Sequence, residues 1–367
     1  MPFLQNPFSG AFGLHLCDSV IKLVRLQKKW HPKNGDYFDV VDIRKTSLPT
    51  GCIANGEIQQ KELVSQKIKL LISKEGGKKP IKSPWVVVNL PVSKTFLKLI
   101  RIKSQPELIT TEAVYFEAAK HLPFDTKDVA IDWQIITDNE KPNGFTKVLI
   151  GAAPKNIADS YLSVIEDAGL YPLALEIEDL SIARSMITAK KTYQNEARAI
   201  LDIGSSRSSI IIYDKGSIQF SSLINVCGDL IDTTLTQRLK IDRETATKLK
   251  DKNGLTYDLN HPLYLKVVND AIDNLIEEIK NILIFYKNHF NNPNPVTHIT
   301  MSGGLSAMKN LDKLLSKKLR VETAPGNAWK NLFNKKFNED DRVKGLPFAA
   351  AIGLALRATE AGWFKKG

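Results

Sequence analysis

The sequence predicts an α/β protein with two lobes that share one duplicated design. The strongest observation is an internal repeat: residues 14–19 (LHLCDS) and 201–206 (LDIGSS) both read as strand, tight turn and strand. Each copy stands near the start of one half of the chain. The 367 residues, 43% hydrophobic and 25% charged, are enough for two separate cores. We therefore expect a cleft between two related halves.

The first half is predicted to begin with a sheet. Residues 13–26 alternate and then run apolar, as a hairpin does, and residues 37–48 add a third strand. Residues 85–91 (WVVVNLP) form a short buried strand. The helix expected between these strands carries four apolar residues on one face: Leu63, Ile68, Leu71 and Ile72.

The pattern changes between residues 92 and 153, which read as strand, helix, strand and strand, a small βαββ subdomain inserted into the first lobe. A mainly helical block follows the second hairpin. We expect the chain to divide as follows: lobe 1 core, 1–91 and 154–196; inserted subdomain, 92–153; lobe 2 core, 197–227 and 293–345; helical subdomain, 228–292; and a C-terminal helix packing on lobe 1, 346–367.

The charge of the chain is unevenly distributed. Its net charge is +11, and residues 305–367 hold 13 Lys or Arg against 6 Asp or Glu, a surplus of 7. Such a basic region attracts an anionic membrane surface weakly, although a plain solvated surface is the alternative. Nucleic acid is not an expected partner, because the chain has no zinc-finger spacing, RNP-like strand or Arg-rich arm. Without an apolar run near 18 residues or a signal-peptide pattern, we expect a cytoplasmic protein.

Cysteine and histidine spacing gives no sign of a metal or disulfide framework. Cys17, Cys52 and Cys227 are scattered singly, with no CxxC pair. The six histidines form no HExxH or His-x-His pattern, so packing or surface roles are expected for them.

The second hairpin carries the chemistry of a phosphate loop. Asp202 stands at the end of an apolar strand, just before a turn in which Gly204 allows a ligand to come close to the backbone. Ser205 and Ser206 add backbone amides and hydroxyl groups to the same turn. Successive turn amides bind phosphate oxygens, while the carboxylate of Asp202 can hold magnesium directly or through water. A plain hairpin, in which Asp and Gly serve the backbone alone, is the alternative.

A second phosphate element is predicted at residues 298–311 (HITMSGGLSAMKNL). Here a strand is followed by Gly303 and Gly304 and then by a helix, whose first amides and positive dipole end favour a nucleotide. The buried side of that helix should hold four residues: Leu305, Met308, Leu311 and Leu315. Gly353, within an apolar helix near the C-terminus, is expected to serve close packing.

With these hairpins and glycines, the chain resembles the actin-like ATPase superfamily, whose core is a duplicated ribonuclease H-like unit. More closely it resembles the type IV pilus assembly protein PilM family. The phrases that carry the resemblance span nearly the whole chain: GLHLCDSVIKLVRL, AAKHLPF, EDAGLYPLALEIEDLSIAR, LDIGSS, CGDLIDTTLTQRL, ATKLK, MSGGLSAMKNL and AIGLALR. The resemblance implies a bilobal fold with an inserted subdomain placed as in the division protein FtsA.

The resemblance also implies site residues. The residues that match the family's ATP and magnesium positions are Lys22, Asp202, Gly204, Ser205, Ser206, Lys248, Gly303 and Gly304. The first hairpin departs from the family pattern, because His15, Cys17 and Asp18 stand where the family has Asp, Gly and Ser. Thr247 replaces a Glu that commonly faces the ribose.

These departures weaken a nucleotide site. His15 cannot replace a magnesium-oriented carboxylate, and Cys17 places a side chain where phosphate meets bare backbone. Asp18 adds a negative charge, which at about 4 Å from a phosphate costs from roughly 1 kcal/mol in water to about 4 kcal/mol at an effective dielectric of 20. ATP and magnesium therefore stay open as cofactors, and hydrolysis is not expected.

The function that the resemblance implies is that of a cytoplasmic scaffold, peripheral at the inner face of the membrane. A groove between the insert and lobe 1 would receive the N-terminal cytoplasmic tail of a PilN-like membrane protein. Other pilus machine subunits, and self-association into a ring, are implied as further contacts. Two alternatives are a filament-forming ATPase of the FtsA type and, less well supported, a small-molecule kinase of the same superfamily. No motif in the sequence supplies a catalytic base for such a kinase.

Overall fold

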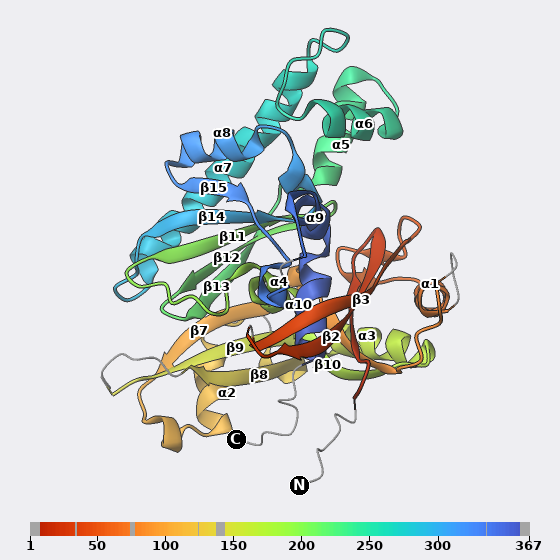
Figure 1. The fold of residues 1–367 in the computed structure, drawn as a ribbon. Helices are drawn as coiled ribbons and strands as arrows, with labels where there is room; N and C mark the ends of the chain where they lie inside the picture. The colour runs from red at the N-terminus through yellow and green to blue at the C-terminus, as the bar shows by residue number, and fades with distance from the viewer. Residues whose placement is uncertain are drawn as a thin grey trace.

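The computed structural model describes residues 8–33, 35–73, 78–123, 125–136, 144–334 and 336–359. It has two lobes, one above the other in Figure 1, each built around the same arrangement of five strands. The strands of lobe 1 run in the order β10-β6-β1-β2-β3, and those of lobe 2 in the order β15-β14-β11-β12-β13. The bounds in lobe 1 are β1 (Phe12–Leu16), β2 (Val20–His31), β3 (Gly35–Ser47), β6 (Trp85–Leu90) and β10 (Tyr171–Ile177). Those in lobe 2 are β11 (Ala197–Ile203), β12 (Ser208–Asp214), β13 (Ser217–Ile224), β14 (Val296–Ser302) and β15 (Glu322–Pro325).

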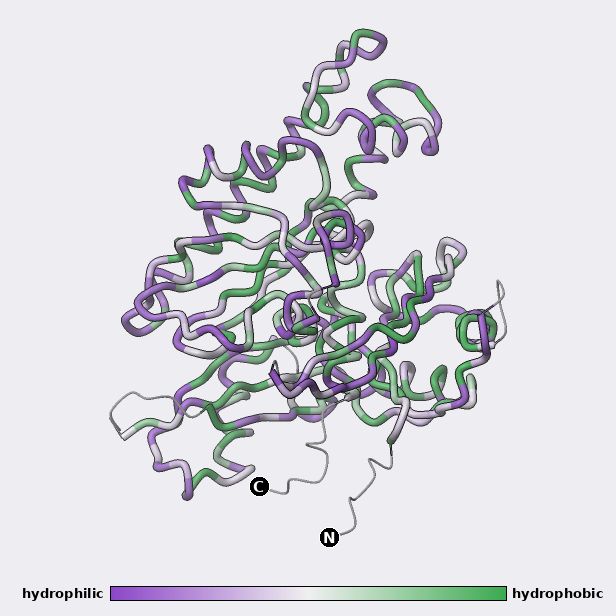
Figure 2. The backbone as a smooth tube through the Cα atoms, in the orientation of Figure 1, coloured by the Kyte–Doolittle hydropathy of each residue, from purple (hydrophilic) through white to green (hydrophobic). Residues whose placement is uncertain are grey.

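The pairing within the two sheets is the same. In each lobe the first three strands are antiparallel, the fourth pairs parallel with the first, and the fifth pairs parallel with the fourth. These inner strands are apolar because helices cover both faces, and β1 is buried along its whole length. Figure 2 shows hydrophobic residues following the strands through the middle of both lobes. The predicted two-lobed, duplicated α/β fold is confirmed.

The helices cover these sheets. Helix α1 packs on α3, and the four residues predicted on one face of α1 all join the core of lobe 1. In lobe 2 the residues 228–292, predicted to be helical, hold three helices. The bounds are α1 (Lys61–Ile72), α3 (Lys155–Asp167), α4 (Glu178–Met186), α5 (Gly228–Leu239), α6 (Arg243–Asn253), α7 (Tyr264–His289), α8 (Leu311–Leu319) and α9 (Glu339–Gly345).

The segment 92–153 has the order strand, helix, strand, strand, and its sheet continues that of lobe 2. The three strands extend the second sheet to eight, in the order β15-β14-β11-β12-β13-β7-β9-β8, with β13 and β7 joined at Phe220 and Lys98. Its elements are β7 (Phe96–Ile102), α2 (Thr111–Ala119), β8 (Val129–Ile136) and β9 (Thr146–Pro154). The insertion therefore follows a strand of lobe 1 in the chain but extends the sheet of lobe 2.

Helix α10 (Ala349–Thr359) packs closely on β1, β2 and α4. A Cβ atom at Gly353 would lie 1.8 Å from the carbonyl oxygen of Ser181, and one at Gly13 would lie 2.4 Å from the amide nitrogen of Ala355. Only glycine allows these backbones to meet, so the packing role predicted for Gly353 is confirmed. Residues 360–367 of the predicted C-terminal segment lie outside the described residues.

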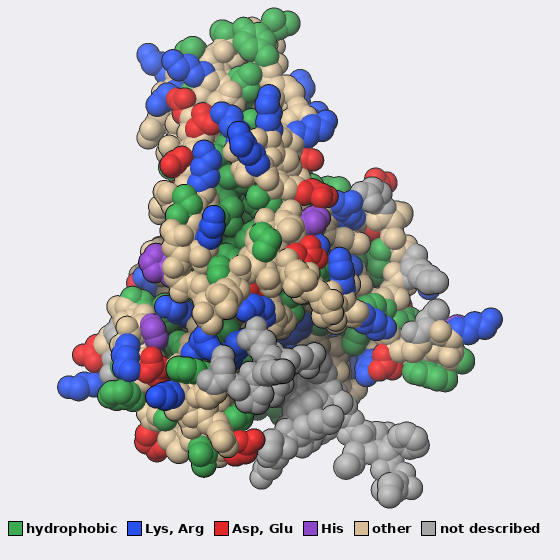
Figure 3. Space-filling model, turned by 90° about the vertical axis from the view of Figure 1, so that its left-hand side faces the viewer, with side chains coloured by type: hydrophobic (Ala, Val, Ile, Leu, Met, Phe, Trp, Pro, Cys, Tyr) green, Lys and Arg blue, Asp and Glu red, His purple; other side chains and the backbone are tan. Residues whose placement is uncertain are grey.

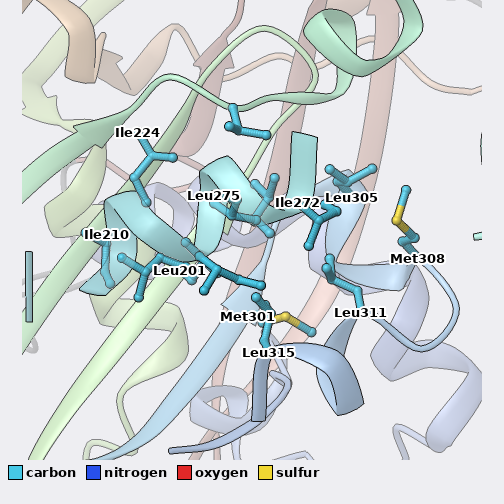
Figure 4. Packing of buried hydrophobic residues seen from close by; sticks show 14 of the residues in the cluster. Leu201, Ile210, Ile224, Ile272, Leu275, Met301, Leu305, Met308, Leu311 and Leu315 are labelled. Carbon is cyan, nitrogen blue, oxygen red and sulfur yellow. The ribbon is translucent and has the colours of Figure 1, made fainter. Parts of the chain in front are cut away.

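The prediction of a helix directly after Gly303 and Gly304 is wrong. A short 3₁₀ turn (Gly304–Ala307) follows the glycines, and α8 begins only at Leu311, after Asn310 in the left-handed conformation. The four residues predicted on the buried side are nevertheless buried, in the core of lobe 2 (Figure 4). The apolar spacing therefore predicted burial correctly, but the left-handed Asn310 interrupts the helix.

Two further features concern membranes and charge. In the part of the chain that the structure describes, no helix combines the length and the apolar character needed to cross a bilayer. On the face drawn in Figure 3, Lys and Arg side chains are spread over the surface and mixed with acidic ones. This face therefore does not carry a single basic patch.

Candidate functional site

The two hairpins of the repeat meet in the structure. In the first hairpin, His15 lies opposite Lys22 on the neighbouring strand. At the equivalent place in the second hairpin, Asp202 lies opposite Ser209. The turns touch directly, since the hydroxyl oxygens of Ser19 and Ser205 lie 3.2 Å apart. The sequence repeat thus predicted two segments, 186 residues apart, that come together between the lobes.

In the first hairpin, His15 lies in a buried polar cluster. Its Nε2 atom is 2.8 Å from a carboxylate oxygen of Glu178, the first residue of α4. The Sγ atom of Cys17 lies 3.3 Å from the same Nε2 and 3.5 Å from Nδ1. Residues 15 and 17 share one side of an extended chain because side chains alternate along a strand. Sequence reasoning missed Glu178, which joins the hairpin only through the fold.

The charges in this cluster support one another. Burial alone would lower the pKa of His15, but the neighbouring Cys17 thiolate and Glu178 carboxylate raise it above its ordinary value. Burial likewise opposes ionisation of Glu178, and the imidazolium of His15 nevertheless holds the pKa of that carboxyl well below its usual range. The same cation lowers the pKa of Cys17 against the effect of burial. The three pKa shifts therefore favour a charged His15 beside the Glu178 carboxylate.

Asp18 does not face an open phosphate site. One carboxylate oxygen is 3.0 Å from Nη2 of Arg207, in the second hairpin, and both oxygens accept backbone amides of Asn55 and Gly56. The side chains of Asp18 and Arg207 are only 16% and 11% exposed, respectively. The expected repulsion of phosphate by a free charge is thus wrong for this structure, because Arg207 neutralises Asp18 and ties the lobes together.

In the second hairpin, Asp202 is held by its own lobe. Its carboxylate accepts the hydroxyl of Ser302, at the end of β14. Burial raises the pKa of Asp202, and the nearby Glu178 adds to that rise. Behind the turn, the carbonyl oxygens of Gly204 and Ser205 accept the first amides of α5, at 3.0 and 2.7 Å. Ser206 lies half-buried in the same turn.

The other predicted cofactor residues are placed differently. Lys22 donates through Nζ to the carbonyl oxygen of Pro347 at 2.6 Å, so it fastens β2 to the segment before α10. The backbone of Gly303 lies against Ile203, where a Cβ atom would be 2.4 Å from the carbonyl oxygen, and Gly303 has a φ of +83°. Beside Gly304 the space is open, with nothing within 4 Å of an added Cβ atom.

The lysine that approaches the second hairpin is Lys250, two residues after the predicted one. Lys248 is 74% exposed and pairs with Glu244 at 2.6 Å. Lys250 is buried, lies 2.7 Å from Asp232 and donates to the carbonyl of Gly228 at 3.3 Å. Thr247 donates its hydroxyl to the other oxygen of Asp232 at 2.9 Å. The sequence held a signal for this, because 250 lies four residues after the buried position 246 on one helix face.

A groove of about 580 Å³ runs between the inserted subdomain and lobe 1. One wall is β8, which contributes the consecutive residues 130–134, and the other includes the end of β10 and helix α4. Five consecutive residues of one strand can line a cavity only if the edge of that strand faces it, because its side chains alternate. Gly151 forms part of the floor, where a Cβ atom would lie 2.9 Å from the Ile177 side chain.

Comparison with known proteins assigns the family. A family model described as "Type IV pilus assembly protein PilM" matches residues 13–359. The chain belongs to the PilM family. Membership assigns it to type IV pilus assembly. The sequence resemblance is thereby confirmed.

Solved structures show the fold. A structure described as a PilM–PilN type IV pilus biogenesis complex has a TM-score of 0.81 at 22% identity, covering 96% of this chain and 100% of that one. The ethanolamine utilization protein EutJ of Carboxydothermus hydrogenoformans has a TM-score of 0.53 at 14% identity, over 94% of this chain and 88% of that one. MreB5 of Spiroplasma citri, bound to AMPPNP, has a TM-score of 0.51 at 12% identity, over 93% and 94%. This PilM family chain therefore has the actin-like fold.

A division protein is also similar in sequence. FtsA of Neisseria meningitidis serogroup B is 24% identical over 230 residues, which are 57% of this chain and 53% of that protein. The PilM family chain thus spans about half the length of this curated relative.

The actin-like fold implies a magnesium nucleotide between the two hairpins, and the first hairpin does not fit one. The hydroxyls of Ser19 and Ser205, 3.2 Å apart, already contact each other across the two turns. Asp18 and Arg207 link the same two turns, and their opposite charges neutralise each other. His15 offers a nitrogen ligand where magnesium prefers oxygen. On the side of lobe 2, Asp202 and the open space at Gly304 keep the expected residue types.

Proposed function

We propose that this chain is a scaffold of the type IV pilus machine that binds the N-terminal cytoplasmic tail of a PilN-like membrane protein. The tail occupies, in extended form, the groove between the inserted subdomain and lobe 1. The observation that carries this proposal is that groove, with β8 as its wall. The match to a solved PilM–PilN complex over 96% of this chain supports it.

The edges of two sheets favour an extended peptide. Within the described residues, β8 ends the eight-stranded sheet and β10 ends the five-stranded sheet, so each pairs with a neighbour on one side only. A strand edge presents unpaired amides and carbonyls, to which an extended peptide can add as a further strand. Backbone hydrogen bonds of that kind provide affinity, while pockets for alternate side chains provide specificity.

The lining of the groove matches such a peptide in chemistry. Most lining side chains are apolar, among them Ile131 and Leu180. At one end Arg184 binds Glu176 through two bonds of 2.6 Å, and Arg357 contacts the same carboxylate. Glu176 is fully buried, whereas the two arginine side chains are 26% and 30% exposed. Two arginines therefore hold one buried carboxylate at this end of an otherwise mostly apolar groove.

The contacts between the hairpins support a binding role without nucleotide turnover. Protein side chains hold the two turns together, through Asp18 with Arg207 and Ser19 with Ser205. We therefore propose that the chain is not an enzyme, and that it works at the cytoplasmic face of the membrane where its partner is anchored. Further pilus subunits, or a ring of copies, would assemble around that complex.

The test uses the groove itself. A synthetic peptide of the cognate partner's N-terminal tail, labelled with a fluorophore, should bind the full chain in an anisotropy titration. Ala158, on α3, lines the groove, and Ala158→Trp should fill it and weaken binding by at least about tenfold, or 1.4 kcal/mol. Asp159→Trp, one residue along the same helix and exposed, is the matched control and should bind as the native chain does. Failure of the native chain to bind the tail would refute the proposal.

The alternatives predict turnover. A coupled ATPase assay with the native chain should give a rate well below 1 per second, the lower end of the usual range for enzymes, roughly 1–1,000 per second. Turnover within that range would favour the filament-forming ATPase. Turnover that depends on an added small-molecule acceptor would favour the kinase.

A further inference from the structure

We propose that His15, Cys17 and Glu178 bind a single zinc ion at the first hairpin. The site stands where the actin-like fold otherwise places a nucleotide phosphate, and the proposal is independent of the partner that occupies the groove. Two of its ligands come from the first hairpin, His15 within β1 and Cys17 directly after it, and the third is the first residue of α4.

The geometry places three ligand atoms around one point. One nitrogen of His15, the sulfur of Cys17 and one oxygen of Glu178 all lie within 4.8 Å of one another. The Nε2 atom is 3.3 Å from Sγ and 2.8 Å from Oε1. A tetrahedral zinc ion with bonds of about 2.0–2.3 Å keeps its ligand atoms roughly 3.3–3.7 Å apart. Small side-chain rotations would therefore bring all three atoms into bonding distance.

The ligand types select the metal. Thiolate, imidazole and carboxylate are the three ligand groups that zinc uses in proteins. Magnesium and calcium prefer oxygen ligands alone, so a sulfur and a nitrogen ligand disfavour them. One thiolate and one carboxylate together cancel the two charges of the ion, which matters at a buried site where an uncompensated charge is costly.

A second observation points to a ligand at the same place. Glu178 is only 8% exposed, and among the described residues its Oε2 atom is buried without a hydrogen-bond partner. A buried carboxylate oxygen without a partner is unusual, because its desolvation is not compensated. A metal ion bound through both oxygens of this carboxylate would satisfy Oε2 as well as Oε1, the oxygen that faces His15.

The site has an open side. Cys17 is partly exposed, whereas His15 and Glu178 are buried. Three protein ligands and one position facing solvent leave room for water or an incoming group as the fourth ligand. In the structural role that we infer, the ion would fix the first hairpin to the start of α4. The second residue of that helix, Asp179, accepts the hydroxyl of Ser209 in lobe 2 at 2.8 Å, so α4 contacts both hairpins.

The experiment titrates the reduced, chelator-treated full chain with Co²⁺, and then with Zn²⁺ as a competitor. We expect one Co²⁺ per chain with a thiolate-to-cobalt charge-transfer band, and its loss as Zn²⁺ displaces cobalt. Cys17→Ser should abolish the band and weaken zinc binding by at least about 100-fold, because even changes outside the ligand shell cost about 10- to 100-fold. Glu178→Gln should weaken binding while keeping the sulfur band.

The matched control is Cys227→Ser, which changes another of the three free cysteines. Cys227 precedes α5 as its N-cap residue, where serine is well tolerated, so this variant should bind cobalt as the native chain does. If the band persists in Cys17→Ser, or if the native chain takes up no metal at one equivalent, the proposal is wrong.

A second measurement avoids any variant. Iodoacetamide should modify Cys17 in the native chain, and one equivalent of Zn²⁺ should slow that reaction by at least about tenfold, since a metal-bound thiolate is a poor nucleophile. Cys52 and Cys227 are buried and serve as internal references in the same mass spectrum. Equal labelling of Cys17 with and without zinc would contradict the proposal.

Discussion

The two hairpins of the repeat have the same backbone and opposite surroundings. In the second hairpin, Asp202 and the turn behind it have partners within their own lobe, namely Ser302 and the start of α5. In the first hairpin, the equivalent His15 and the nearby Asp18 have partners outside their own sheet, namely Glu178 in α4 and Arg207 in the other lobe.

This difference shows how two copies of one hairpin can have different contacts while their strands stay the same. In both copies the strands persist because apolar residues such as Leu14 and Leu201 are fully buried in their sheets. The polar positions of the turns are free to change, because the sheet does not depend on them. In the first copy those positions have become contacts within the protein, so that the turn now joins the lobes.

The largest effect should come from the support behind the second hairpin. Lys250→Met leaves Asp232 buried without its cation, since the two side chains are 7% and 5% exposed. We expect the free energy of unfolding to fall by about 3–5 kcal/mol, measured by urea denaturation.

The control for this prediction is Lys248→Met. Lys248 pairs with Glu244 at 2.6 Å, but both side chains are more than 70% exposed, so its replacement should change stability little. Equal losses in the two variants would show that burial does not distinguish these lysines.

The next effect concerns the contact across the lobes. Arg207→Met removes the cation beside Asp18, which keeps two backbone amides as partners. We expect a loss of about 2–3 kcal/mol in the free energy of unfolding. Arg238→Met is the matched control: its ion pair with Asp270 has the same 3.0 Å length, but both side chains are half exposed. If both variants lose equally, the first hairpin is not a buried junction between the lobes.

A third prediction converts the first hairpin back to a phosphate loop. The triple variant His15→Asp, Cys17→Gly, Asp18→Ser restores a carboxylate and a glycine to the turn, and it removes the Asp18 carboxylate that is paired with Arg207. Its affinity for a fluorescent ATP analogue should exceed that of the native chain by at least about tenfold, or 1.4 kcal/mol. Adding Asp202→Ala should remove the gain. Equal affinity of native and triple variant would mean that the first hairpin does not decide nucleotide binding.

The smallest effect is a pH dependence at the second hairpin. Burial raises the pKa of Asp202, so the folded state holds a proton that the unfolded chain has released. The free energy of unfolding therefore decreases as the pH rises from 3.8, the ordinary pKa of this side chain, to the raised pKa of Asp202 in the folded state. The decrease is about 1.4 kcal/mol for each pH unit between these two pKa values. Asp202→Asn keeps an acceptor for Ser302 and removes this penalty. Its stability relative to native should increase from pH 4 to pH 8 in urea titrations, and a flat difference would contradict the assignment.

The sequence predicted the fold well because local patterns determine it. Alternating and apolar runs identified β1, β2 and β6, and the repeat identified the two halves. It failed at α8, where Asn310 adopts a left-handed conformation that apolar spacing does not reveal. The candidate site was predicted only in part. Ser205 contacts the first hairpin through Ser19, and Asp202 instead accepts the hydroxyl of Ser302, whereas Lys248 is exposed and pairs with Glu244.

What the sequence by itself determined is the duplicated design, the family and the position of both hairpins, because these depend on residues close together in the chain. The tertiary structure alone decided the partners of the altered residues. His15 and Glu178 are 163 residues apart, and nothing in their local sequences relates them. Their contact, like that of Asp18 with Arg207, depends on how helices and lobes pack. The physical reason is that strand periodicity is a local property, whereas the pairing of buried charges is set by the arrangement of the whole fold.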